Sequence, residues 1–144
     1  MSAEELFPLC NFFVLPGWLL LAIAPRWKGT QIISSMVIPL TLAVVYLVLL
    51  ISQFSVLEGG FSSLSGVARL FENPYALLAG WIHYLAFDLF IGSWEVRDAR
   101  RLEIHHGLVL PCLVVTFLFG PIGLLLYFGV RFGARRKGNT ALDV

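Results

Sequence analysis

Four apolar stretches, each long enough to cross a lipid bilayer, constrain the fold of this 144-residue chain most. They cover residues 6–24, 31–52, 74–94 and 106–130. A membrane-spanning helix needs about 20 mainly apolar residues, because the hydrocarbon core is about 30 Å thick. Lipid cannot hydrogen-bond to a peptide backbone, so helices are favoured there. The sequence therefore predicts an all-α integral membrane protein with a four-helix transmembrane domain over residues 1–130.

Composition and charge agree with the membrane class. Charged residues make up only 13% of the chain and hydrophobic ones 58%, whereas a soluble domain carries about 25% charged residues. A net charge of +1 gives no reason to expect a nucleic-acid partner. The opening MSAEELF is acidic, unlike the basic start of a targeting peptide. We expect the lipid bilayer as partner and a multi-pass protein of a bacterial inner membrane.

Prolines inside three of these stretches predict kinked helices, because proline removes a backbone donor and clashes with the preceding turn. They are Pro8, Pro16, Pro39, Pro111 and Pro121. Between the second and third stretches, apolar residues recur at helical spacing over residues 62–71. This spacing predicts a short amphipathic helix on the membrane surface, with a plain loop as the alternative. Residues 131–144 are basic, then polar, and are predicted to be a disordered tail.

Membrane orientation does not follow from the charges of such a four-span chain. Four spans place both termini on one side, and positive residues normally concentrate in cytoplasmic loops. Here five Lys and Arg residues fall on each side. One side holds Arg26, Lys28, Arg97, Arg100 and Arg101, and the other holds Arg69, Arg131, Arg135, Arg136 and Lys137.

The third stretch carries ionisable residues that a membrane helix ordinarily avoids. At about 100° per residue, His83, Asp88, Glu95 and Asp98 fall within roughly 140° of arc. A charge near the bilayer centre costs roughly 2.5–3.5 kcal/mol and usually faces a protein interior or a water-filled cavity. Gly80 shares this face and lets a helix or ligand approach closely. We therefore expect a lateral groove lined by this helix.

The opposite face of the same helix is expected to contact lipid. It consists of Ile82, Leu85, Leu89 and Val96. Along the polar face, His83 to Asp98 covers about 22 Å at 1.5 Å per residue, which leads from near the midplane to one water interface. Such a groove can receive an amphiphile end-on.

Three chemical interpretations of the polar face remain open. In the first, Asp88 lies deeper and Glu95 nearer water, so that one donates and one accepts a proton while His83 orients or relays it. In the second, His83, Asp88, Glu95 and Asp98 hold a divalent metal. In the third they are structural: Asp88 pairs with an arginine or hydrogen-bonds to Asn11 or Thr116 across the bundle, and the outer carboxylates are solvated.

Several motifs identify a family resemblance. AGWIHYLAFDLFIGSWEVRDARR, HHGLVLPCLVVTFLFGPIGLLLY, NFFVLPGWLLLAIAPRW and GVARLFENP together closely resemble the abscisic acid deficient 4-like (ABA4-like) family of small four-helix membrane proteins. The resemblance covers about residues 7–130, and the motifs WIHYLAFDLF and FGPIGLLLY are specific. The family's polar motif falls on His83, Asp88, Glu95 and Asp98, with His106 and Pro121 in the later block.

This resemblance implies a function in carotenoid chemistry. The plant member is tied to neoxanthin formation from violaxanthin, in which an epoxide opens and an allene forms without net redox change. That reaction suits acid–base catalysis better than a redox metal. The resemblance thus implies an intramembrane isomerase of a carotenoid or related isoprenoid. The alternatives are a non-catalytic carotenoid-binding, lipid-binding or accessory protein, and a metal-dependent membrane enzyme.

The predicted site combines the polar face with this resemblance. The catalytic residues are predicted to be His83, Asp88 and Glu95. The predicted substrate-binding residues are Asn11, Gly80, Tyr84, Phe87, Trp94, Arg97, Asp98 and His106. No cofactor is favoured, although a divalent metal on His83, Asp88, Glu95 and Asp98 stays possible. Oligomerisation is also left open.

Overall fold

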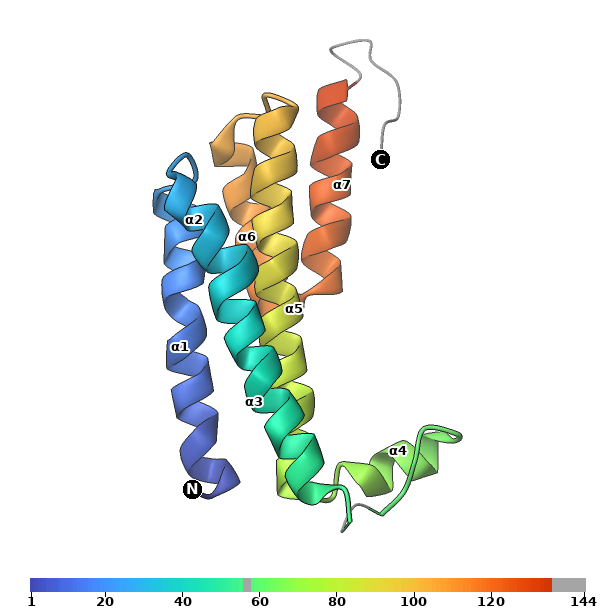
Figure 1. The fold of residues 1–144 in the computed structure, drawn as a ribbon. Coiled ribbons are helices and arrows are strands. Elements are labelled where there is room, and N and C mark those ends of the chain that lie inside the picture. The colour runs from blue at the N-terminus through green and yellow to red at the C-terminus, as the bar shows by residue number, and fades with distance from the viewer. Residues whose placement is uncertain (56–57, 136–144) are drawn as a thin grey trace.

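A computed structural model describes residues 1–55 and 58–135, in which all regular secondary structure is helical (Figure 1). The elements are α1 (Ala3–Ile23), α2 (Lys28–Ile32), η1 (Ile33–Val37), α3 (Ile38–Gln53), α4 (Leu64–Leu70), α5 (Pro74–Arg101), α6 (His106–Phe119) and α7 (Pro121–Arg135). The predicted all-α class is confirmed.

Three helices among the described residues are long and apolar enough to cross a membrane. They are α1, the continuous rod Lys28–Gln53 formed by α2, η1 and α3, and α5. The rod contains a π-helical segment that ends where α3 begins, and Pro39 lies in the first turn of α3. The wider π-helical turn redistributes the backbone hydrogen bonds where proline offers no donor. The hydroxyl of Ser34 in this segment donates to the carbonyl oxygen of Gly17 at 3.0 Å and ties the rod to α1.

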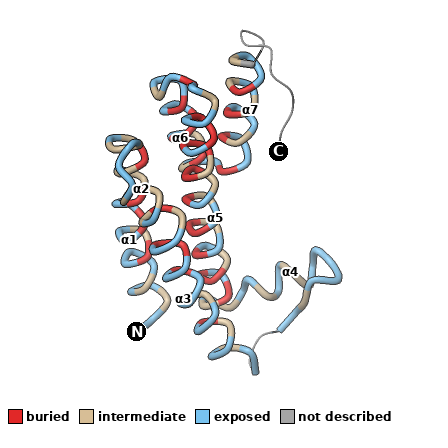
Figure 2. Tube along the Cα trace, turned by 45° about the horizontal axis from the view of Figure 1, so that its top comes forward, coloured by how far each residue is buried: buried red, intermediate tan, exposed pale blue. Residues whose placement is uncertain are grey.

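Helix α5 is the central helix of the bundle. It begins where Asn73 caps it, the Oδ1 atom accepting from the backbone N–H groups of Tyr75 at 2.9 Å and Ala76 at 3.2 Å. The predicted start at Pro74 and the predicted continuation beyond residue 94 are both confirmed. It packs against α1, α3 and α6 and also touches α7. Buried positions consequently occur along most of its length (Figure 2).

The prediction that one side of α5 faces lipid is wrong. Ile82, Leu89 and Val96 are 0% exposed and Leu85 is 5% exposed, because α1 and α3 cover this side of the helix. Apolar side chains suit lipid and protein interior equally well, so their pattern alone does not distinguish the two.

The expected fourth span over 106–130 is two helices rather than one. The chain turns at Gly120, whose φ of +48° lies in the left-handed region that glycine adopts readily. Pro121 then opens α7, a position that suits proline because its missing N–H would be unpaired there. At about 1.5 Å per residue each arm is roughly 21–22 Å long, shorter than the hydrocarbon core. The hairpin therefore returns to the end where it began (Figure 1).

The prediction that a disordered tail begins at residue 131 is also wrong. Helix α7 continues through Arg135, and the side chain of Arg131 is buried inside the bundle. Residues 136–144 of the predicted tail lie outside the described residues.

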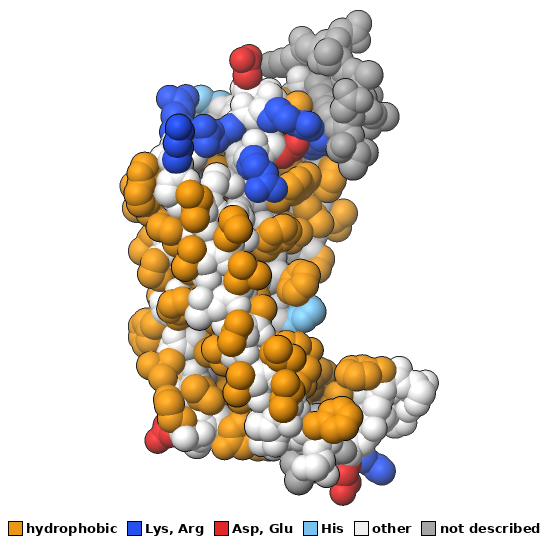
Figure 3. Space-filling view, in the orientation of Figure 1, with side chains coloured by type: hydrophobic (Ala, Val, Ile, Leu, Met, Phe, Trp, Pro, Cys, Tyr) orange, Lys and Arg blue, Asp and Glu red, His pale blue; other side chains and the backbone are white. Residues whose placement is uncertain are grey.

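Because of the hairpin, nearly all of the described Lys and Arg residues lie at one end of the molecule. Figure 3 shows Lys and Arg side chains gathered there, at the end opposite the N-terminus. Of the described Lys and Arg residues, only Arg69 lies at the other end. The residues at the cation-rich end whose side chains are described are Arg26, Lys28, Arg97, Arg100, Arg101 and Arg131. The equal division expected for four spans is therefore wrong.

The predicted short helix between the second and third spans is confirmed as α4. Ser63 caps it by accepting from the backbone N–H of Gly66 at 3.0 Å. The helix stands away from the bundle at the end that carries the N-terminus (Figure 1). Its large apolar residue Leu64 is 86% exposed, as expected of a helix that meets lipid.

Candidate functional site

An apolar groove lies between the first half of α5 and the N-terminal half of α1. A cavity of about 590 Å³ occupies it. The lining residues are Ala3, Glu4, Phe7, Phe71, Pro74, Leu77, Leu78, Gly80, Trp81 and Tyr84. Gly80 keeps the groove open at its wall, since a Cβ atom there would lie 3.0 Å from the ring of Phe71. The groove has the apolar, aromatic lining typical of lipophilic ligand sites.

A second cavity of about 290 Å³ adjoins the first and reaches α6. Trp81 and Tyr84, whose rings stack at 5.2 Å, line both cavities. Trp81 Nε1 donates to Asn11 Oδ1 at 3.0 Å, which fixes the indole against α1. Tyr84 donates its hydroxyl to the carbonyl oxygen of Phe117 at 3.2 Å. The two cavities therefore lead along α5 to the end of α6.

Asp88 lies one helical turn beyond Tyr84, against the turn of the α6–α7 hairpin. A Cβ atom on Gly120 would lie 2.8 Å from Asp88 Oδ1, so only glycine leaves room for this carboxyl group. Asp88 is half-buried, and its buried Oδ2 has no hydrogen-bond partner among the described residues. It stands beside the first turn of α7, where the helix dipole favours negative charge.

Glu95 lies two turns further along the same side of α5. It is 0% exposed and accepts one hydrogen bond, from Thr116 Oγ1 of α6 to Oε1 at 3.0 Å. The other oxygen, Oε2, is buried and has no partner among the described residues. A carboxyl group with so few donors is costly to bury in charged form. Within the bundle, Glu95 is more buried than Asp88, so Asp88 is not the better sheltered of the two carboxyl groups.

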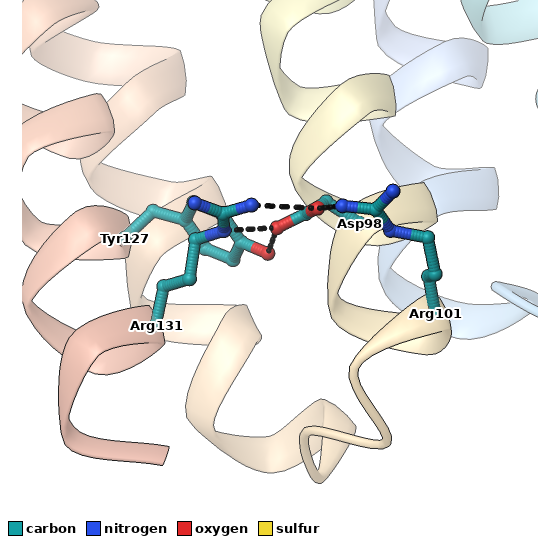
Figure 4. A network of polar contacts seen from close by, with 4 residues as sticks. All are labelled: Asp98, Arg101, Tyr127 and Arg131. Carbon is teal, nitrogen blue, oxygen red and sulfur yellow. Dashed lines mark hydrogen bonds and ion pairs between the residues drawn. The ribbon is translucent and has the colours of Figure 1, made fainter. Parts of the chain in front are cut away.

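Asp98 joins α5 to α7 at the cation-rich end (Figure 4). Its Oδ2 accepts from the Tyr127 hydroxyl and from Arg131 Nε, both at 2.7 Å. Its Oδ1 accepts from Arg131 Nη2 at 3.4 Å and from Arg101 Nη2 at 3.3 Å. Asp98, Tyr127 and Arg131 are all buried. This network fixes the free end of the hairpin to the bundle.

His83 is not brought together with the two inner carboxyl groups. Its exposed ring stacks on Phe87 at 4.5 Å and approaches Tyr46 of α3 at 6.0 Å. Asp88 points instead toward the hairpin turn. The expected proton relay through His83 therefore has no contact that supports it.

The predicted substrate-binding residues divide between separate places. Asn11, Gly80 and Tyr84 line the groove cavities. Trp94, Arg97 and Asp98 line a different cavity near α7. Phe87 is 58% exposed on the bundle surface. His106 begins α6, and its Nε2 atom shares a hydrogen bond of 2.9 Å with the carbonyl oxygen of Ala22 in α1.

The sequence interpretation missed Tyr127 and Arg131, and its structural alternative offered Thr116 as one of several partners of Asp88. Thr116 bonds to Glu95 rather than to Asp88. The Gly120–Pro121 pair could have indicated the hairpin, since glycine often follows a helix end and proline often begins a helix. Such a hairpin brings Arg131 back toward the cation-rich end of α5.

The proposed metal ligands do not converge. Within residues 1–55 and 58–135, no three His, Cys, Asp or Glu side chains are grouped as a metal ion requires. Asp98 is engaged with arginines, and His83 faces away from Asp88. The metal alternative therefore has no assembled ligand set in the described residues.

Comparison with known proteins agrees with the family resemblance. A model of the family "ABA DEFICIENT 4-like" matches residues 5–127. "Protein ABA DEFICIENT 4, chloroplastic" of Arabidopsis thaliana is 31% identical over 137 residues, covering 88% of this chain. The chain spans 60% of the length of that relative. No solved structure matches.

Proposed function

The chain belongs to the ABA DEFICIENT 4-like family, and from that premise we propose that it is an intramembrane isomerase of a carotenoid or related isoprenoid. The observation that carries this proposal is a buried carboxyl oxygen without a hydrogen-bond partner among the described residues, on Asp88, one helical turn beyond Tyr84, which lines both groove cavities. Groups left unpaired in a cleft are candidates for chemistry, because they lack the bonds that a structural role provides.

The shape and lining of the groove support the proposed substrate class. A carotenoid is a long apolar rod with a ring at each end, and the groove offers aromatic walls along α5 and α1. In the proposed complex the carotenoid chain lies against Trp81 and Phe7, whose ring centroids are 5.6 Å apart. Its end ring reaches Tyr84, which lines both cavities and lies one turn before Asp88. The polar end of the guest thus meets the carboxyl group.

The reaction is an internal proton transfer with no net redox change. The base, Asp88, removes a proton from the polyene carbon next to an epoxide-bearing ring carbon. The electron pair of that C–H bond forms the second double bond of an allene. The epoxide C–O bond at that ring carbon breaks at the same time, and the oxygen receives a proton equivalent to the one that Asp88 removed, so that it becomes a hydroxyl and the mass is unchanged. Acid–base assistance of this kind typically contributes 10²–10⁴-fold to a rate.

Glu95 is the second member of the proposed acid–base pair. At about 1.5 Å per residue it lies roughly 10 Å from Asp88 along α5, too far for both to contact adjacent substrate atoms. We assign substrate contact to Asp88 and give Glu95 the task of restoring its protonation state. The Tyr84 hydroxyl, one turn before Asp88, exchanges its hydrogen bond to the carbonyl oxygen of Phe117 for one to the epoxide oxygen when substrate binds. His83 has no role in this scheme.

The test is conversion of an epoxy-carotenoid by membranes that contain the protein. Membranes from a host that makes 5,6-epoxy carotenoids are analysed by chromatography and mass spectrometry. We expect a product of unchanged mass with an allenic absorption spectrum. Asp88→Asn should lower its yield at least 100-fold at equal protein abundance, while His83→Phe should keep it within about threefold. Unchanged pigments across several epoxide substrates would refute the isomerase.

A non-catalytic carotenoid-binding protein is the rival function, because the same groove suits a bound pigment. The two are separated by measuring bound pigment as well as product. In the proposed enzyme, Asp88→Asn still co-purifies with pigment while product is lost. A binding protein would retain pigment and would lack product in every variant, including the unmodified chain.

The proposed location of the chain is a membrane. Membrane residence rests on the three apolar helices. The bacterial inner membrane stays a prediction that the comparison does not support, since the Arabidopsis relative carries the description "chloroplastic". Fractionation of the native cell, followed by detection of the chain in each membrane, tests it.

A further inference from the structure

A third cavity, separate from the two groove cavities, opens between α5 and α7 at the cation-rich end. Its volume is about 310 Å³. The lining residues are Trp94, Arg97, Asp98, Arg101, Phe128 and Arg131. Three of the six carry guanidinium groups and only one carries a carboxylate, so the cavity has an excess of positive charge. It shares no lining residue with either groove cavity.

Arg131 is held in this cavity with part of its guanidinium unused. It is 5% exposed, and its Nε and Nη2 atoms bond to Asp98. No described residue accepts a hydrogen bond from its third nitrogen, Nη1. The guanidinium also lies 5.7 Å from the centroid of the Phe128 ring. A buried cation fixed on one side by a carboxylate is preorganised to bind an anion on its other side.

Arg97 completes the positive wall at the outer edge. It is exposed, one residue before Asp98 on α5, and forms no hydrogen bond or ion pair with any other described residue. Arg101, one turn further on, contacts Asp98 and is 56% exposed in its side chain. The hairpin is secured to Asp98 by Arg131 and Tyr127 of α7.

Aromatic residues form the apolar part of the same cavity. The rings of Trp94 and Phe128 are 5.7 Å apart, and Trp94 also contacts Tyr127 edge-on at 5.4 Å. The guanidinium groups suit an anionic head group, and the aromatic rings suit an apolar chain. The cavity therefore fits an amphiphile that has both. Guanidinium groups bind phosphate oxygens in a fork geometry that suits them better than a simple point charge. Basic pockets between membrane helices are suited to phosphate head groups for this reason.

We propose that the cavity between α5 and α7 binds the phosphate group of an anionic amphiphile, with Arg97, Arg101 and Arg131 as its ligands. The phosphate belongs either to a bilayer phospholipid or to a phosphorylated isoprenoid, and both present the same chemistry to the arginines. The apolar chain lies along Trp94 and Phe128. This binding is independent of the proposed isomerase, since it uses other residues at another depth of the bundle.

The experiment measures lipid retained by the full chain, purified in neutral detergent and mixed with equal amounts of phosphatidylglycerol and phosphatidylcholine. Native mass spectrometry then counts each lipid bound. We expect preferential retention of phosphatidylglycerol, reduced about tenfold or more in Arg97→Gln/Arg101→Gln, since the variant removes two charge-assisted contacts. Arg100→Gln is the matched control: it lies on the same turn but donates to the carbonyl oxygen of Pro25.

Competition identifies the source of the phosphate. Displacement of phosphatidylglycerol by micromolar geranylgeranyl diphosphate assigns the site to phosphorylated isoprenoids, whereas resistance to it assigns the site to bilayer lipid. Equal retention of both phospholipids by the unmodified chain would overturn the proposal. So would an equal loss in the Arg100→Gln control, because the effect would then be general surface charge. Pigment conversion is unaffected by either result.

Discussion

The ion-pair network at Asp98 offers the sharpest test of the hairpin packing. We consider Asp98→Ala, which removes the acceptor of four contacts that reach it from α7 and from its own helix. Asp98 and Arg131 have side chains that are only 5% and 7% exposed. The substitution therefore leaves a cation buried without its partner.

The expected loss of stability follows from this burial. Breaking a buried ion pair by removing one partner costs about 3–5 kcal/mol, because the remaining charge is uncompensated. The Tyr127 hydroxyl also loses its acceptor, although this cost overlaps with the first. We expect Asp98→Ala to lower the free energy of unfolding by about 4 kcal/mol. Arg101→Ala should cost less than about 1 kcal/mol, since that side chain is 56% exposed.

The assay is reversible unfolding in mixed micelles, followed by tryptophan fluorescence. Trp94 contacts Tyr127 and thus reports when α7 separates from α5. The double variant Asp98→Ala/Arg131→Leu should recover most of the loss, because no buried charge then remains. A loss below about 1 kcal/mol for Asp98→Ala, or no recovery in the double variant, would refute a buried pair that anchors the hairpin.

Three further predictions test the hairpin and the inner carboxyl groups. Reporters placed before α1 and after α7 should lie on opposite faces of the membrane, with the α7 end on the cytoplasmic or equivalent side; detection on one face would restore four spans. Gly120→Ala should destabilise the protein by about 1–3 kcal/mol through its positive φ and its contact with an α5 carboxylate, whereas Gly129→Ala, which meets nothing within 4 Å, should not; equal melting temperatures would contradict this. Thr116→Val should cost about 1–3 kcal/mol by removing the one hydrogen bond that the Glu95 carboxyl group accepts from a described side chain, and the exposed Thr41→Val serves as control in the same unfolding assay; a neutral Thr116→Val would show that the carboxyl group finds another donor.

The sequence predicted the central helix well because its signals are local. Asn73 and Pro74 mark its start through capping and a fixed φ, which depend on neighbours in the chain alone. The same holds for the short helix capped by Ser63. That Asp88, Glu95 and Asp98 turn toward protein also followed from sequence, since lipid penalises charge.

Which neighbour each carboxyl group meets could not be predicted in this way. Asp88 lies against Gly120, Glu95 bonds to Thr116 and Asp98 binds Arg131, all across helix pairs. These partners depend on how far the last apolar stretch enters the bundle. Helical periodicity gives the face of a residue but not the identity of what covers that face.

By itself, the sequence determined the helical class, the membrane environment, the family and the presence of acidic groups on one rod, because each follows from composition or local spacing. Tertiary structure alone decided that residues 106–135 form a hairpin of two short arms. That turn returns Arg131 to the end of α5 where Asp98 lies, and it leaves nearly every described cation at one end. An apolar stretch of 25 residues is long enough either to cross the bilayer or to enter it and return. The choice depends on the positive φ at Gly120 and on packing against α5.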